Sequence, residues 1–412
     1  MRVSETTAAA MLVREADRTV SNGVPNFERA QPTLDEKVRF LSRPESYPQP
    51  VRSVIQRETH MSWVFLAGDK VYKLKKPVRF PYLDFSTPPR REDACRAELS
   101  LNRRLAADVY LDVVPLTTTP RGLTIGEKGD VVDWLVVMRR LDESNTLEHA
   151  IEEQRLKRWQ LDLLADTLAQ FYRRVPAVLL SSMLHLADWH RSMAYNRQIL
   201  LSSRFSLPTG LVRRIDYVQR RFLKHNSRML VRRARDRCIV DGHGDLRPEH
   251  IWLGDPVRVI DCLEFNARLR AVDPFDEIAF LSLECERLGA RWAGEYIRRR
   301  ITPALRDGLS EELFLFYRCH RAMLRARLAI AHLLEPNPRT PHKWPPLAHE
   351  YLRIAAGDAT RLDRWLNRRE GSLGLRRGAA AGSPPQARAR PTRYRSCSAQ
   401  SMPPAGRKAH RR

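Results

Sequence analysis

Residues 241–251, which read DGHGDLRPEHI, gather aspartate, histidine, glutamate and glycine as no other part of the chain does. Short apolar runs border this stretch, at residues 238–240 before it and at residues 251–253 and 257–260 after it. Such runs, bounded by turn residues, predict strands. Polar loops between strands often carry reactive side chains, because the strands fix a geometry that the loop alone could not hold. We therefore expect the functional centre of the protein in this loop.

Two aspartates of this region have the spacing of a phosphoryl-transfer site. Asp245 and Asp261 lie sixteen positions apart, and His250 follows the first of them by five positions. In kinase-type enzymes one aspartate accepts the proton of the acceptor group, and another carboxylate holds metal on the nucleotide phosphates. The spacing therefore predicts that Asp245 orients and deprotonates an acceptor and that Asp261 is a metal ligand.

Residues 243–251, followed by Ile260-Asp261, resemble the aminoglycoside/choline-kinase-type phosphotransferase family, whose loop usually reads His-Gly-Asp-x-x-x-x-Asn before a later Ile-Asp. The motif Gly-Asp-Leu-Arg-Pro-Glu-His resembles that of one largely uncharacterised branch of the family. Some members of this branch carry an appended P-loop domain. We do not expect that domain here, because the chain has no Walker A sequence. The resemblance implies a protein-kinase-like two-lobe α+β fold. It also implies transfer of the γ-phosphate of ATP, with Mg²⁺, to a hydroxyl or amine of a small molecule.

Two short runs near residue 70 predict a hairpin that would cover the nucleotide. Residues 62–67 and 71–75 read as strands, and the intervening Gly68-Asp69 is a turn signal. Lys73 and Lys75 share one face of the second strand, because side chains alternate along a strand. The resemblance implies that Lys73 contacts the nucleotide phosphates, with Lys75 as the competing assignment.

Two later segments complete the predicted nucleotide site. Residues 90–106 have the periodicity of a helix, and Glu98 on it could form the ion pair that positions Lys73. Residues 131–138 read as a strand that resembles the one leading into the inter-lobe hinge. Met138, at its end, is therefore expected to line the nucleotide site.

The chain reads as β-rich up to residue 141 and as helical beyond it. Helical patterns occupy six segments, at residues 160–172, 182–199, 211–234, 275–288, 311–334 and 347–366. We predict a weakly ordered extension (1–33), a β-rich N-lobe (34–141), a helical C-lobe with the catalytic loop (142–366) and an Arg-rich tail (367–412). The tail has few large apolar residues and is predicted to be disordered.

The metal ligand at position 250 remains open at the level of sequence. His250 stands where the family has Asn, and imidazole suits Mn²⁺ or Zn²⁺ better than Mg²⁺. Either His250 binds a softer ion, or it is a hydrogen-bonding residue and Glu249 or Glu264 supplies the oxygen. We expect His243 to brace the loop rather than to react.

Composition indicates which partners and which cellular compartment to expect. The formal net charge is +24, of which residues 367–412 contribute +11 (twelve Lys and Arg against one Glu) and the rest +13. This excess is readily explained by a solvated, Arg-rich surface, although a nucleic acid or another anionic partner of the tail stays open. The six cysteines form no Cys-x-x-Cys pair, and no run reaches the roughly 20 apolar residues of a membrane span. We therefore expect a soluble, cytoplasmic protein. The resemblance implies that its ligands are a nucleotide and a small-molecule acceptor.

Two other functions use the same residues. A nucleotide-binding pseudokinase would result if the change to His250 had abolished turnover. A metal-dependent hydrolase would use His243, Asp245, His250 and Asp261 as a cluster that activates water. The hydrolase leaves the hairpin lysine and the helix glutamate unexplained.

Overall fold

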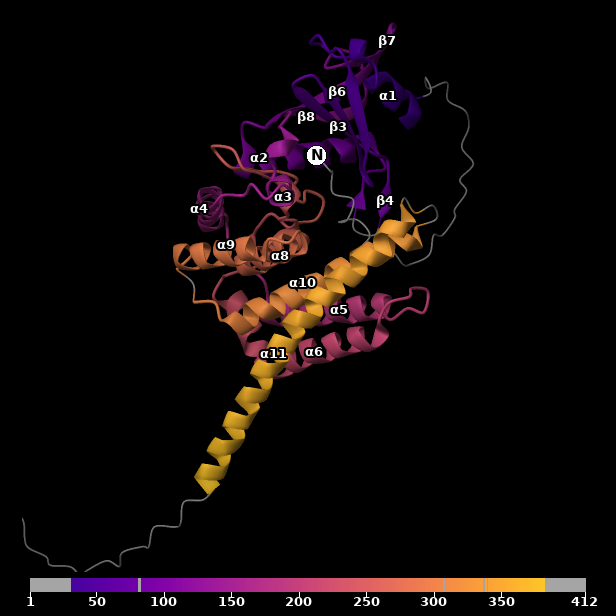
Figure 1. Ribbon diagram of the computed structural model, residues 1–412. Helices are drawn as coiled ribbons and strands as arrows, with labels where there is room; N and C mark the ends of the chain where they lie inside the picture. The colour runs from indigo at the N-terminus through magenta and orange to yellow at the C-terminus, as the bar shows by residue number, and fades with distance from the viewer. Residues whose placement is uncertain (1–30, 81–82, 307, 336–337, 339, 382–412) are drawn as a thin grey trace, which may run out of the picture. The chain divides into compact units, whose positions relative to one another are not determined.

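The computed structural model describes residues 31–80, 83–306, 308–335, 338 and 340–381 (Figure 1). The chain divides into two compact units, Met1–Leu366 and Asn367–Arg412. The first unit contains the β-rich and the helical regions that the sequence predicts.

The N-terminal half of the first unit is built on a six-stranded antiparallel sheet. Its strand order is β1-β2-β3-β8-β6-β7, and a separate two-stranded hairpin consists of β4 and β5. The strands are β1 (Val54–Glu58), β2 (Ser62–Ala67), β3 (Lys70–Lys75), β4 (Arg79–Phe80), β5 (Leu83–Asp84), β6 (Tyr110–Thr119), β7 (Gly122–Ile125) and β8 (Asp130–Arg139). Strands β2 and β3 meet at Gly68, whose φ of +65° is the left-handed conformation that glycine adopts without steric cost. The predicted hairpin is confirmed.

Alternation along the strands gives the sheet two different faces. One face packs under helix α1 (Leu34–Leu41), with Tyr72 and Leu74 in that cluster. The other face carries Val71 and Met138, which lie in one cluster with Ile260 from the C-terminal half. Helix α2 (Pro88–Ala106) packs on β8 and β6. The residues that follow the catalytic loop therefore reach the sheet on the face that carries Lys73.

The C-terminal half is helical. Its helices are α3 (Leu147–Glu152), α4 (Arg158–Arg174), α5 (Ser182–Leu200), α6 (Thr209–Arg235), α7 (Ala267–Arg270), α8 (Pro274–Arg287), α9 (Arg291–Ala304), α10 (Glu311–Ala331) and α11 (Trp344–Ala381). Helices α8 and α10 form the centre of its core, since most of their residues are buried. The prediction of an α+β two-lobe fold is confirmed.

Short strand pairs hold the loop that the sequence singles out. Strand β9 (Val240–Asp241) pairs with β12 (Ala271–Val272), and β10 (Ile251–Trp252) pairs with β11 (Arg258–Val259). The loop between β9 and β10 thus starts from one pair and ends in the other. The predicted strands on both sides of the loop are confirmed.

The ends of the chain differ in part from the prediction. Helix α11 continues to Ala381, whereas the sequence reading ended the last helix at residue 366 and began a disordered tail there. Residues 382–412 and most of the predicted extension, residues 1–30, lie outside the described part of the chain.

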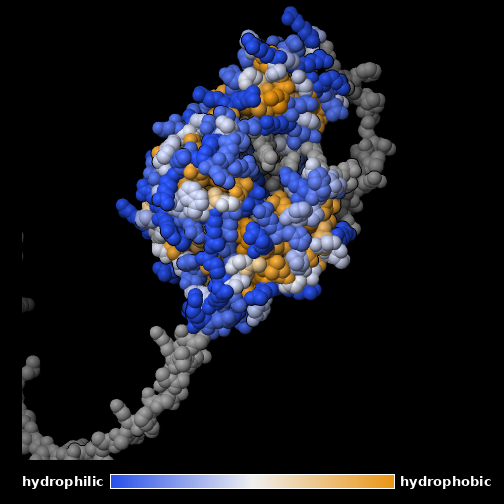
Figure 2. Space-filling model, viewed as in Figure 1, coloured by the Kyte–Doolittle hydropathy of each residue, from blue (hydrophilic) through white to orange (hydrophobic). Residues whose placement is uncertain are grey.

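The surface visible in Figure 2 is mostly hydrophilic, with hydrophobic residues gathered in limited patches. Across the described residues, no helix has the combination of length and apolar character that a bilayer crossing requires.

Candidate active site

Lys73 lies at the centre of a cluster of opposite charges between the sheet and the catalytic region. Its Nζ is 2.8 Å from Oε1 of Glu98 on helix α2 and 3.1 Å from Oδ1 of Asp261. The ion pair predicted between Lys73 and Glu98 is therefore present. Burial alone would lower the pKa of Lys73, but the carboxylates of Asp261 and Glu98 outweigh it and hold that pKa well above its usual range. Lys73 is thus a permanent cation beside the predicted metal ligand.

Lys75 points to the same glutamate from a deeper position. Its Nζ is 2.7 Å from Oε2 of Glu98 and 2.5 Å from Oε1 of Glu264, and its side chain is fully buried. Lys73 keeps 11% of its side chain exposed. Of the two competing lysines, Lys73 is therefore the one beside Asp261, while Lys75 anchors Glu98 from behind. We call Lys73, Lys75, Glu98, Asp261 and Glu264 the lysine cluster.

Asp261 has an unusual backbone conformation. Its φ is +63°, in the left-handed region that residues other than glycine seldom adopt. Its backbone N–H donates to the hydroxyl of Tyr110 on β6, at 3.1 Å. The next residue is fixed as well, because the N–H of Cys262 donates to Oδ1 of Asn102 on helix α2. A strained conformation held by two elements of the N-lobe indicates that the position of this carboxylate matters.

His250 faces Asp261 with one ring nitrogen. Its Nδ1 is 2.9 Å from the carbonyl oxygen of Asp245, and a carbonyl oxygen only accepts, so Nδ1 carries the proton of this bond. Nε2 lies 3.5 Å from Oδ2 of Asp261 and 3.3 Å from Nη2 of Arg247. In the neutral ring, the Nε2 lone pair is therefore directed to the region between Asp261 and Arg247.

This pair of side chains fits a divalent ion in part. Ligand atoms lie about 2.0–2.2 Å from Mn²⁺-sized or Zn²⁺-sized ions, so two ligands of one ion can stand about 3.5 Å apart. A histidine ligand commonly donates its other N–H to a carbonyl, as Nδ1 of His250 does. Within the described residues, no group of three or more His, Cys, Asp or Glu side chains forms a complete metal cage. An ion at this position would need further oxygens from water or phosphate.

Each of the two alternative oxygen donors has one carboxylate oxygen engaged elsewhere, although Oε2 of Glu249 is buried without a hydrogen-bond partner among the described residues. Glu264 pairs with Lys75, and Oε1 of Glu249 is 2.6 Å from Nη1 of Arg247. Neither contact directs these carboxylates to His250. The donor set that the structure brings together is Asp261 and His250.

Asp245 is buried on the other side of His250. Its Oδ2 lies 3.1 Å from both Nε and Nη2 of Arg247, whose side chain is only 2% exposed. Burial would raise the pKa of Asp245, but the charge of Arg247, and then that of His250, lowers it below its usual value. Asp245 is therefore an oriented carboxylate that stays ionised. We call Asp245, Arg247, Glu249 and His250 the loop cluster.

The loop is braced from two sides. Nδ1 of His243 accepts from the N–H of Asp245 at 3.3 Å, and its Nε2 is 3.0 Å from the carbonyl oxygen of Ile260. Burial is the main cause that lowers the pKa of His243 to about 3, so the ring is neutral. Glu277 on α8 accepts from the N–H groups of His243 and Gly244. These contacts give His243 the bracing position that the sequence predicts.

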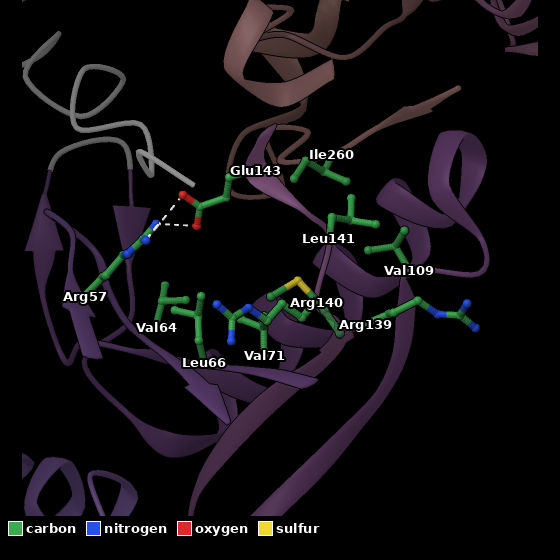
Figure 3. A pocket seen from close by; sticks show the side chains of 11 residues that line it. Arg57, Val64, Leu66, Val71, Val109, Arg139, Arg140, Leu141, Glu143 and Ile260 are labelled. Atoms are coloured by element: carbon green, nitrogen blue, oxygen red, sulfur yellow. Dashed lines mark hydrogen bonds and ion pairs between the residues drawn. The ribbon is translucent and has the colours of Figure 1, made fainter. Parts of the chain in front are cut away.

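An apolar cavity opens next to the lysine cluster. Figure 3 shows Val64, Leu66 and Val71 on one side of it, with Leu141 and Ile260 on the other. Met138 also lines it, as predicted. Apolar side chains on two sides can enclose a flat heterocyclic ring.

An ion pair lies across one side of this cavity. Nη1 of Arg57, on β1, is 2.8 Å from Oε1 of Glu143, which follows the segment that connects the two lobes (Figure 3).

Several residues of the site could not be read from the sequence. Three side chains accept hydrogen bonds from backbone N–H groups of segments that are distant in sequence: Tyr110, Asn102 and Glu277. No local sequence pattern marks these residues. Arg247 pairs with Asp245, while Asp241 at the start of the loop pairs with Arg104 and Arg270.

Comparisons with known proteins give uncharacterised relatives. No protein-family model matches the chain. The uncharacterised proteins Mb2027c of Mycobacterium bovis and Rv2004c of Mycobacterium tuberculosis are each 32% identical to it over 296 residues. The aligned part is 68% of this chain and 56% of each relative, so the chain spans little more than half the length of the relatives it matches.

Solved structures similar to the chain include three small-molecule kinases. A choline/ethanolamine kinase family protein from Mesorhizobium loti has a TM-score of 0.47 and 14% identity, covering 81% of this chain and 97% of that one. A choline kinase from Cryptosporidium parvum has a TM-score of 0.44 and 9% identity, covering 82% and 97%. A spectinomycin phosphotransferase in complex with ADP and spectinomycin has a TM-score of 0.41 and 11% identity, covering 77% and 95%.

Proposed function

We propose that the protein is an ATP-dependent phosphotransferase that moves the γ-phosphate to a hydroxyl or amine of a small molecule. The observation that carries this proposal is the contact of Lys73 with both Glu98 and Asp261. It joins the sheet, helix α2 and the segment after the catalytic loop at one point. Kinase-type phosphoryl transfer uses such a lysine–glutamate pair beside a metal-binding aspartate.

Each residue then has a role that follows from its surroundings. The heterocycle of the nucleotide would occupy the cavity next to Met138, which places its phosphates toward the lysine cluster. Lys73, still partly exposed, would bind phosphate oxygens while Glu98 holds its position. Asp261 and His250 would hold a divalent ion, which supplies charge neutralisation on the phosphates.

Asp245 would act on the acceptor. The acceptor group donates a hydrogen bond to Asp245 as its oxygen or nitrogen forms a bond to the γ-phosphorus. The bond from that phosphorus to the bridging oxygen of ADP breaks, the released electron pair stays on ADP, and Asp245 receives the proton. A carboxylate with a lowered pKa suits this task, because the transition state is loose and the acceptor proton moves late. Orientation is then the larger contribution of Asp245.

We expect a softer ion at this site than in the aminoglycoside/choline-kinase-type family, which usually has asparagine where this chain has His250. An imidazole nitrogen is a poorer ligand for Mg²⁺ than for Mn²⁺, and the second ligand is a single carboxylate. We therefore expect Mn²⁺ to support nucleotide binding at lower concentration than Mg²⁺ does.

Calorimetric titration with a non-hydrolysable ATP analogue tests the proposal. The titration is run in Mg²⁺, in Mn²⁺ and with a chelator, for the natural protein and for Asp261→Asn. Asp108→Asn is the matched control, because it also removes a carboxylate paired with a basic side chain, here Arg258, but at the surface. We expect metal-dependent binding that Asp261→Asn weakens at least tenfold and that Asp108→Asn leaves unchanged.

The other outcomes separate the alternatives. No binding under any condition would overturn the kinase proposal and favour the metal-dependent hydrolase. Metal-dependent binding followed by no turnover with any acceptor from a broad panel of amines and alcohols would favour the pseudokinase.

A further inference from the structure

Helix α6 (Thr209–Arg235) carries many positive charges and almost no negative ones. It contains nine lysines and arginines and a single acidic residue, Asp216, whereas the whole chain has 72 basic and 48 acidic residues. A solvated helix face usually carries both signs interspersed. The composition of α6 therefore differs from that of an ordinary Arg-rich surface.

Seven of these cations lie on the outside of the helix. They are exposed, while the remaining two, Arg221 and Arg233, are not. We call the seven the outer face of α6: Arg213, Arg214, Arg220, Lys224, Arg228, Arg232 and Arg235.

Four of the seven cations of the outer face are not neutralised by the described part of the protein itself. The other three are paired, Arg220 with Asp216, and Arg232 and Arg235 with Asp236. Among the described residues, Arg213, Arg214, Lys224 and Arg228 form no ion pair. The one acidic residue of the helix, Asp216, is buried and already pairs with Arg197 and Arg220.

Helix α10 shows the contrast. Its Arg318, Arg321 and Arg325 are all buried, and each pairs with at least one carboxylate. These three cations of α10 thus belong to the core, whereas the four unpaired cations of α6 are available to a ligand.

The length of the outer face selects an extended anion. From Arg213 to Arg235 the two helical segments of α6, which meet in a kink at Asn226, rise by about 33 Å in total at 1.5 Å per residue. A nucleotide or another small anion would touch only one or two of these cations. About 33 Å is close to one turn of a nucleic-acid duplex, which carries one negative charge per roughly 1.7 Å of its axis. The helix is interrupted at Asn226, and exposed cations continue on both sides of that point.

The apolar side of α6 argues against a membrane. An interfacial helix inserts its apolar face between lipids. In α6 that face is already buried in the protein core, with Val212, Ile215 and Phe222 fully covered. Tyr217 is the large hydrophobic side chain that α6 leaves exposed, at 62%. A single tyrosine among cations suits a contact with a phosphate backbone better than insertion into a bilayer.

We propose that the outer face of α6 binds the phosphate backbone of double-stranded nucleic acid, without base specificity. The proposal does not depend on the phosphotransferase activity, since it uses none of the residues of the lysine cluster or the loop cluster.

Salt-dependent fluorescence anisotropy with a labelled duplex of about 24 base pairs tests this surface. The full chain is compared with a variant that carries Arg213→Gln, Arg214→Gln, Lys224→Gln and Arg228→Gln. A second variant removes the same charge elsewhere, with Arg52→Gln, Arg121→Gln, Lys128→Gln and Arg299→Gln. These four control cations are exposed and lie outside α6. All three proteins keep the basic tail, so its contribution is common to them.

We expect duplex binding whose affinity falls steeply with salt. Each phosphate contact contributes about 0.9 to the slope of log K against log salt, so the α6 variant should lose about 3 to 4 from that slope. Its dissociation constant near 0.1 M salt should rise at least about tenfold, while the control variant stays within about twofold. Equal thermal unfolding midpoints of the three proteins show that only the surface has changed.

Three outcomes would overturn the proposal. The first is absence of duplex binding at about 50 mM salt. The second is an equal loss in both variants, which would assign binding to net charge. The third is binding of the natural protein, but not of the α6 variant, to vesicles containing phosphatidylserine while the duplex is ignored, which would assign the surface to a membrane.

Discussion

The lysine cluster and the loop cluster meet at Asp261, but they handle buried charge in different ways. The lysine cluster has an exposed end, since 11% of the Lys73 side chain and 18% of the Asp261 side chain reach solvent, and a sealed end at Lys75. The centre of the loop cluster is closed, with Arg247 and His250 each 2% exposed, and its exposed end is Glu249, at 12%. Groups that exchange partners when a ligand binds need access, whereas groups that only orient others are best held by burial. The comparison assigns ligand exchange to Lys73 and Asp261, and to Arg247 the orientation of Asp245.

The largest expected effect tests the loop cluster. Asp245→Asn keeps the shape of the side chain but removes the charge that accepts the proton. We expect turnover to fall by about 10²–10⁴, the usual contribution of a general base, while the affinity for nucleotide changes less than about twofold. Steady-state kinetics and analogue titration measure the two quantities. Full turnover in this variant would show that the reacting centre lies elsewhere.

The next effect separates the two lysines of the other cluster. Lys75→Met leaves Glu98 and Glu264 buried without this cation, and breaking a buried pair costs about 3–5 kcal/mol. Lys73→Met should cost less stability, because its end of the cluster is open, but should weaken nucleotide binding at least tenfold. Chemical denaturation and analogue titration, applied to both variants, give the pattern. A stable Lys75→Met protein that no longer binds nucleotide would exchange the two roles.

These lysines also show how far sequence reasoning reaches. Alternation along β3 correctly placed both on one face, and the strand boundaries of β2 were predicted as observed. Nothing local could choose between them, because a shift of two residues keeps the same face. The choice depends on where Asp261 and Glu264 arrive in space, which is fixed by contacts such as that of Asn102 with Cys262.

Helix α9 marks another limit of local reading. It was not predicted, and it contains Gly294 and Pro303, two residues that disfavour helices. A Cβ atom at Gly294 would lie 2.6 Å from the Cα of Ser282 on α8. The glycine therefore permits a close approach of two helices, a tertiary reason that a helix propensity does not contain.

A metal ion bound by Asp261 and His250 would connect the lysine cluster to the loop cluster. His250→Asn replaces the imidazole by an amide oxygen, which Mg²⁺ accepts more readily. We expect the ratio of nucleotide affinities in Mn²⁺ and Mg²⁺ to fall about tenfold relative to the natural protein. The surface variant His342→Asn controls for loss of a histidine. An unchanged ratio would mean that His250 is a hydrogen-bonding residue only, and that the coupling of the clusters does not involve metal.

The smallest effect concerns a buried group that has no opposite charge beside it. His320 on α10 is buried, its Nε2 lies 3.0 Å from the hydroxyl of Ser192, and burial followed by the charges of Arg321 and Arg327 lowers its pKa to about 3. Below a pH of about 6.5 the unfolded chain binds a proton at this residue, whereas the folded protein does not until about pH 3. The free energy of unfolding should therefore fall with decreasing pH in that window, by up to about 1.4 kcal/mol per pH unit for this residue.

His320→Phe should flatten this dependence, because phenylalanine binds no proton in either state. Denaturation curves between about pH 7.5 and pH 4.5 measure the slope, and the variant is compared with its own stability at the upper pH so that lost packing cancels. His342→Phe, at an exposed position, should leave the slope unchanged. Equal slopes in the natural protein and in His320→Phe would mean that an opposite charge reaches this histidine in the folded state. The contrast with the two clusters, where burial is compensated by paired charges, would then be lost.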